Sequence, residues 1–119
     1  AQGFHWPVME GRKVFKHASV RMPEAVYEAL NAHQKTTNDI DLFIPHQANL
    51  RISEMVQQRL GLPDDKVFNN IQKYGNTTAC SIPLAIDEAV KAGKLRRGDL
   101  LCLAGFGAGF TWGSALIRW

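Results

Sequence analysis

Short apolar runs alternate with stretches of helical periodicity along most of this chain of 119 residues. The strand-length runs cover residues 41–45, 66–69, 100–104 and 111–118, and the helical stretches cover residues 14–33, 48–60 and 79–92. Alternation of strand, turn and helix is typical of an α/β layer. Because the chain is long enough for one hydrophobic core only, we predict one α/β folding unit.

Glycine and proline mark the expected ends of the helices. Gly61, followed by Pro63, is a stop signal for the helix at residues 48–60, and Gly93 ends the last helix. Pro23 interrupts the first helical stretch, so we expect a kink or a break there.

Two segments lack such periodicity. Residues 105–109 read GFGAG and predict a tight turn between the last two strands, with Phe106 pointing into or capping a pocket. No helix follows this segment, so it is a weak nucleotide-binding signal. Residues 1–10 are punctuated by glycine and proline and predict a surface lead-in.

Charge and cysteine content exclude several classes of function. The formal net charge is +3, and the basic residues are scattered, which argues against a nucleic-acid-binding domain. No apolar run approaches the roughly 18 residues that span a membrane. Cys80 and Cys102 lie far apart in apolar sequence, so we expect two buried thiols and a cytoplasmic location. The histidines show no metal-ligand spacing, so we predict no metal site.

His46 and Asn76 occupy equivalent places, because each follows a predicted strand and precedes a predicted helix. Ligands bind at the carboxyl ends of parallel strands in open α/β sheets, so both side chains could reach one pocket. A neutral imidazole and a side-chain amide would supply two hydrogen-bond donors to a developing oxyanion. From the residues alone, the other interpretation is that His46 satisfies a backbone group and Asn76 is a turn residue beside Gly75, and it is the more common one.

Arg51 and Arg59 share one flank of the predicted helix at residues 48–60. They could meet an acidic partner. A solvated helix face is the other interpretation, and it is the more common one.

Three blocks of sequence resemble the 3-oxoacyl-[acyl-carrier-protein] synthase III family (β-ketoacyl synthase III), a member of the thiolase-like superfamily. Residues 44–52 read IPHQANLRI, residues 74–79 read YGNTTA and residues 105–116 read GFGAGFTWGSAL. Elongating ketoacyl synthases have a second histidine in place of Asn76, and chalcone synthases have a proline in place of Ala108. The initiating class therefore fits best.

The resemblance implies the C-terminal half of the enzyme that begins fatty-acid synthesis. That enzyme transfers an acyl group from acyl-CoA to a cysteine and condenses it with malonyl-acyl-carrier protein, releasing carbon dioxide, without a cofactor. His46 and Asn76 match the histidine and asparagine of its Cys-His-Asn triad. Phe106 matches an aromatic residue beside the nucleophile, and Ala108 matches the oxyanion-hole position.

The resemblance also implies binding roles and partners. Asn49 falls in the CoA and pantetheine tunnel, and Lys16, Arg51 and Arg59 fall on or near the surface that docks the acidic carrier protein. The partners implied are acyl carrier protein, a CoA thioester and the N-terminal half of the same enzyme, with the full enzyme a homodimer. No nucleic acid or membrane is implied.

The family's nucleophilic cysteine belongs to the N-terminal half, and neither Cys80 nor Cys102 matches it. We therefore interpret residues 1–119 as a partial C-terminal catalytic domain, inactive alone. The implied fold is a thiolase-like layered α/β/α half-domain with a mixed sheet that lacks its first strands. We expect an open sheet edge and uncovered apolar surface around Leu42, Ile44, Leu101, Leu103 and the turn at residues 105–110. The alternative is a non-catalytic module of the same fold that binds carrier protein or CoA.

Overall fold

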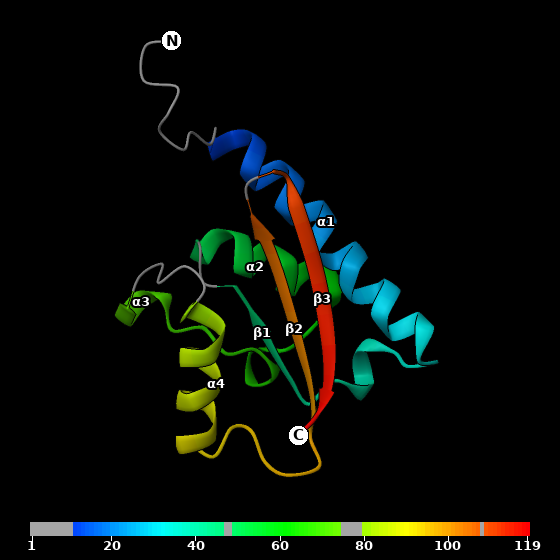
Figure 1. The fold of residues 1–119 in the computed structure, drawn as a ribbon, viewed down its shortest axis with the longest axis vertical. Helices are drawn as coiled ribbons and strands as arrows, with labels where there is room; N and C mark the ends of the chain where they lie inside the picture. The colour runs from blue at the N-terminus through cyan, green and yellow to red at the C-terminus, as the bar shows by residue number, and fades with distance from the viewer. Residues whose placement is uncertain (1–10, 47–48, 75–79, 108) are drawn as a thin grey trace.

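A computed structural model describes residues 11–46, 49–74, 80–107 and 109–119 of the chain (Figure 1). The elements follow the order α1 (Gly11–Ala32), η1 (Thr37–Asp39), β1 (Leu42–Pro45), α2 (Leu50–Leu60), η2 (Asp64–Lys66), α3 (Ile71–Tyr74), α4 (Ser81–Lys91), β2 (Leu100–Gly107) and β3 (Thr111–Arg118). The predicted surface lead-in at residues 1–10 lies outside the described residues.

The three strands form one mixed sheet in the order β1-β2-β3. Strand β1 runs parallel to β2, with Leu42 opposite Leu101 and Pro45 opposite Ala104, and β3 runs antiparallel to β2. Parallel neighbours need a crossover connection, and α2, α3 and α4 lie in the segment that joins β1 to β2. The predicted α/β architecture is confirmed.

Successive side chains of the strands point to opposite faces of the sheet and pack into two hydrophobic cores, one on each face. Phe43 and Cys102 belong to the core that α1 and α2 cover. Leu42, Ile44 and Leu101 belong to the core that α4 covers with Ala85 and Ala89. Helices α1 and α2, the sheet, and α4 therefore make three layers (Figure 1).

Helix α1 continues through Pro23, so of the two outcomes expected there, a kink or a break, the break is wrong. A proline inside a helix removes one backbone hydrogen bond. Met22 and Val26, on either side of Pro23, are both buried against the sheet. Tertiary packing of this face holds the helix together across the proline.

The expected strand at residues 66–69 is also wrong. Residues 64–66 form a short 3-10 helix, and Val67 makes an isolated parallel bridge to Phe43. The backbone N–H of Phe68 donates to the carbonyl of Phe43 at 3.0 Å. The segment therefore touches β1 too briefly to extend the sheet as a strand.

The uncovered apolar surface expected on the sheet is present only in part, at Leu103 and residues 105–107, which are half-buried. It is wrong for Leu42, Ile44 and Leu101, whose side chains are at most 1% exposed. Helix α4 covers them. The exposed large apolar side chains of this layer lie on α4 itself, where Leu84 is 36% and Val90 is 41% exposed.

Only one of the two thiols is buried, contrary to expectation. Cys102 lies in the middle of β2 and is fully buried, whereas Cys80 is exposed. Cys80 immediately precedes α4, whose buried side is formed by Ser81, Ala85 and Ala89. A position one residue before this stripe is turned about 100° away from it.

Gly61 ends α2 in the left-handed conformation, with φ of 68°, as the sequence predicted. A Cβ at this position would meet no atom within 4 Å. We therefore expect Gly61→Ala to lower the free energy of unfolding by about 1 kcal/mol through backbone strain alone. Urea denaturation measures the change.

Gly113→Ala is the matched control, because Gly113 also has open space around it but no positive φ. We expect this control to be neutral or slightly stabilising. Equal losses in both variants would mean that φ is not the cause at Gly61.

Candidate active site

His46 lies directly after β1, at the carboxyl edge of the parallel pair β1-β2. Its backbone N–H donates to the carbonyl of Ala104 at 2.8 Å, which continues the pairing beyond β1. A Cβ on Gly105 would lie 3.8 Å from the Cβ of His46. The parallel register therefore places His46 beside the glycine-rich end of β2.

Ser81 contacts the imidazole of His46 from the opposite layer. Its Oγ lies 2.5 Å from Nδ1 of His46, and Ser81 is only 1% exposed as the first residue of α4. Ser81 is not among the site residues predicted from the sequence. A serine at the start of a helix resembles a common cap, and nothing local distinguishes it from a residue of the site.

His46 and Phe106 line the same small cavity, together with Val14, Ala18, Met22 and Ile52. The cavity has a volume of about 20 Å³, room for about one water molecule. Partial burial in this apolar surrounding lowers the pKa of His46 below its ordinary value of 6.5. The imidazole is therefore neutral at neutral pH.

Phe106 belongs to a group of aromatic rings at the end of β2. Its ring centroid lies 5.1 Å from that of Phe110 and 6.0 Å from that of Trp112, and the Phe106 and Trp112 rings are nearly parallel. The guanidinium of Arg21 lies 5.6 Å from the Trp112 ring. These contacts hold Phe106 in place as a wall of the cavity.

Asn76 and Ala108, the other two predicted residues of the catalytic centre, lie outside the described residues. Their roles remain predictions. Asn49 is described: its Oδ1 accepts a hydrogen bond from the backbone N–H of Arg51 at 2.8 Å and caps α2. The side chain is exposed, and its predicted role in substrate binding is not tested by this geometry.

The three predicted docking residues, Lys16, Arg51 and Arg59, are all exposed along the packed pair α1 and α2. The Arg51 guanidinium lies 5.6 Å from the ring of Phe15, the neighbour of Lys16. At the other end, the Tyr27 hydroxyl donates to the carbonyl of Arg59 at 3.3 Å. Arg51 therefore lies against the turn of α1 that carries Lys16, and Arg59 lies two turns further along α2, about 12 Å along the helix axis.

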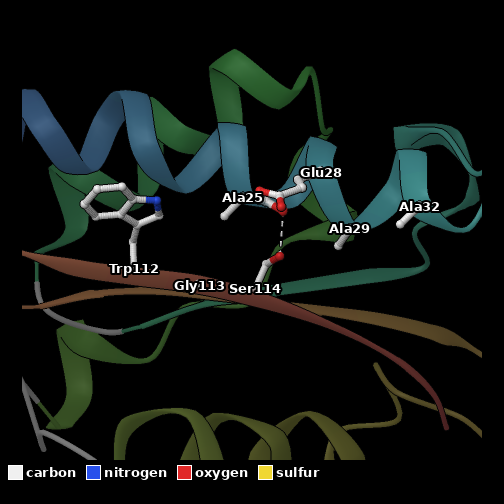
Figure 2. A pocket seen from close by; sticks show the side chains of 7 residues that line it. All are labelled: Ala25, Glu28, Ala29, Ala32, Trp112, Gly113 and Ser114. Carbon is white, nitrogen blue, oxygen red and sulfur yellow. Dashed lines mark hydrogen bonds between the residues drawn. The ribbon is translucent and has the colours of Figure 1, made fainter.

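A separate groove of about 370 Å³ runs between α1 and the outer strand β3 (Figure 2). Ala25, Ala29 and Ala32 form its helical wall, and Trp112 closes one end. The Ser114 hydroxyl donates to the carbonyl of Ala25 at 2.6 Å across it. The groove contains none of the predicted site residues.

Neither cysteine of the chain has the surroundings of an activated nucleophile at this site. Burial raises the pKa of the Cys102 thiol to about 12, so it stays protonated. Cys80 lies on the surface before α4. In the described part of the chain, no cluster of three or more potential metal ligands occurs, and no helix is long and apolar enough to cross a membrane.

The lowered pKa of His46 makes stability depend on pH. Well above pH 6.5 the ring is neutral in both the folded and unfolded states. Below this value the unfolded state binds the proton first, so the free energy of unfolding falls as the pH drops toward the folded pKa. We expect His46→Asn to lose less stability than the unsubstituted protein between pH 7.5 and pH 5, measured by urea denaturation. Parallel pH curves would contradict the assigned burial of the imidazole.

Comparison with known proteins identifies the family. Residues 30–119 match the sequence profile of the C-terminal domain of 3-oxoacyl-[acyl-carrier-protein] synthase III. The chain is 49% identical over 120 residues to β-ketoacyl-[acyl-carrier-protein] synthase III of Synechocystis, covering 100% of this chain and 36% of that protein.

Similar solved structures support the same family. The chain resembles 3-oxoacyl-[acyl-carrier-protein] synthase III of Aquifex aeolicus, with a TM-score of 0.94 and 45% identity, over 100% of this chain and 39% of that one. The β-ketoacyl-[acyl-carrier-protein] synthase III of Thermus thermophilus gives a TM-score of 0.91 and 51% identity, over 94% of this chain and 35% of that one. The chain thus spans little more than a third of these relatives, has their thiolase-like fold, and belongs to the family of the 3-oxoacyl-[acyl-carrier-protein] synthase III C-terminal domain.

Proposed function

We propose that this chain supplies the decarboxylation half of an initiating condensing enzyme of fatty-acid synthesis, an acyltransferase that joins an acyl-CoA primer to malonyl-acyl-carrier protein. The observation that carries the proposal is His46, held as a neutral imidazole at the carboxyl edge of β1 beside the end of β2. The shared name of the relatives supports the same reaction.

The chemistry asks for hydrogen-bond donors at the malonyl thioester carbonyl. When the malonyl carboxylate leaves as carbon dioxide, the electron pair develops as an enolate, whose negative oxygen needs stabilisation. Ser81 occupies Nδ1 of His46, so Nε2 is the imidazole atom that faces the substrate in our proposal. Asn76 precedes Ser81 by one short segment of sequence, and its side-chain amide is the second donor.

The acyl group itself requires a nucleophilic cysteine from outside residues 1–119. Cys102 is buried with a raised pKa, and Cys80 does not match the family's nucleophile. The cavity beside His46 holds about one water molecule, so the acyl and pantetheine groups need walls from elsewhere. Phe106 and Ala108 would line the acyl-cysteine side, and Asn49 the pantetheine side.

The exposed residues Lys16, Arg51 and Arg59 support carrier-protein docking, because an acidic partner is steered by basic residues on an open surface. The partners of our proposal are acyl carrier protein, a CoA thioester and the cysteine-bearing part of the same enzyme, which we expect to act as a cytoplasmic homodimer without a cofactor. The alternative function is a module that only binds carrier protein or CoA. Such a module would keep this basic surface but would not catalyse decarboxylation of the malonyl group.

We expect His46→Ala and Asn76→Ala, each in the whole enzyme that carries this chain, to slow malonyl decarboxylation on the order of 10²-fold or more. Acylation of the cysteine should remain largely intact, because the donors act on the malonyl group. Radiolabelled carbon dioxide release and mass spectrometry of the acyl-enzyme measure the two steps separately. Equal loss of both steps would contradict the roles, and the 119-residue chain alone should give no product.

We expect Arg51→Glu to raise the KM for malonyl-carrier protein and to leave the KM for acyl-CoA nearly unchanged. The defect should shrink toward roughly 0.5–1 M salt, where the Debye length falls to a few ångströms. Steady-state kinetics at two salt concentrations measures both effects.

Arg97→Glu is the matched control for charge reversal, because Arg97 is exposed at the opposite edge of the sheet, before β2 begins. We expect this variant to keep both KM values. A salt-independent loss in Arg51→Glu would assign Arg51 to packing on Phe15 instead.

A further inference from the structure

The contact between Ser81 and His46 joins two layers of the fold at the site. Ser81 begins the buried stripe of α4, which continues through Ala85 and Ala89 against β1. The small alanine side chains bring the start of α4 close to the end of β1. The Oγ of Ser81 thereby reaches Nδ1 of His46 at 2.5 Å.

We propose that Ser81 is a positioning residue for His46: its hydroxyl donates to Nδ1, keeps the imidazole proton on Nε2 and fixes the direction of the Nε2–H bond. The catalytic consequence of this inference rests on the proposed function, whereas the contact between Ser81 and His46 is independent of it. In a neutral imidazole one nitrogen carries the proton and the other accepts. The partner of one nitrogen therefore decides what the other can do.

The donor direction matters for the chemistry. If Ser81 donates, Nε2 is a hydrogen-bond donor toward a developing enolate oxygen. If Ser81 instead accepted a proton from Nδ1, Nε2 would be an unprotonated acceptor and would repel that oxygen. The role proposed for His46 in decarboxylation requires the first arrangement.

A second buried serine serves as a control, because it separates the loss of the contact with His46 from the loss of any buried hydroxyl. Ser53, on α2, is as buried as Ser81, at 1% exposure, and its Oγ has no hydrogen-bond partner among the described residues. Ser53→Ala therefore removes a buried hydroxyl without touching the imidazole, and it is the matched control for Ser81→Ala.

The first test measures the tautomer of His46 in the unsubstituted enzyme, and a variant serves only for assignment. Nitrogen-15 NMR of the histidine side chains in the whole enzyme that carries this chain distinguishes the two neutral tautomers, with His46→Asn used to assign the signals. We expect the proton of His46 on Nε2 in one dominant form. A proton on Nδ1 would overturn the proposal, whatever the activity of the enzyme.

The second test compares Ser81→Ala, Ser81→Thr and Ser53→Ala in the same enzyme. We expect Ser81→Ala to mix the two tautomers of His46 and to lower kcat for malonyl decarboxylation roughly five- to tenfold, the cost of one neutral hydrogen bond. KM and cysteine acylation should not change. Ser81→Thr, which keeps the hydroxyl, should restore most of kcat, and Ser53→Ala should have neither effect.

The outcomes separate this inference from the proposed function. A single Nε2–H tautomer in Ser81→Ala with full activity would overturn the positioning role. The two roles can also separate in the other direction. If Ser81→Ala changes the tautomer of His46 but His46→Ala decarboxylates malonyl-carrier protein normally, Ser81 positions the imidazole and His46 has no catalytic role. If Ser81→Ala does not fold, Ser81→Cys keeps the size with a weaker donor, and the same mixing of tautomers is expected.

Discussion

The parallel pairing of β1 with β2 is the constraint on which the site depends. Both strands are buried on both faces, so a shift of one residue would send Leu42 and Ile44 to the core that accepts Phe43. The hydrophobic register is therefore fixed. The hydrogen bond from the His46 N–H to the Ala104 carbonyl carries that register one residue past β1 and sets the histidine beside the end of β2.

The three layers meet at His46. Its ring borders the cavity beneath α1 and α2, and its Nδ1 contacts α4 from the other side of the sheet. Small residues along α4 permit this approach, since Ala85 and Ala89 are fully buried against β1. A change in core packing on either face would consequently move the imidazole, although no core residue takes part in the proposed chemistry.

The chain keeps an apolar environment and a charged environment apart. The side chains around His46 are mostly hydrocarbon, and their low polarity lowers its pKa and favours the neutral ring. The basic residues lie on the solvent side of α1 and α2, with Arg51 over the Phe15 ring. Long-range attraction of an acidic partner can therefore operate at the surface without adding positive charge at the imidazole.

The sequence by itself determined the features that depend on neighbouring residues. Glycine at position 61 ends a helix because its backbone tolerates positive φ, and the short apolar run before His46 forms a buried strand. Tertiary structure decided what depends on packing between distant segments. Pro23 lies inside an unbroken helix because the sheet holds both sides of it, and Cys80 is exposed because the buried stripe of α4 begins one residue later. The contact of Ser81 with His46 exists only because the sheet and α4 pack together, and no local pattern in the sequence encodes the distance between two such layers.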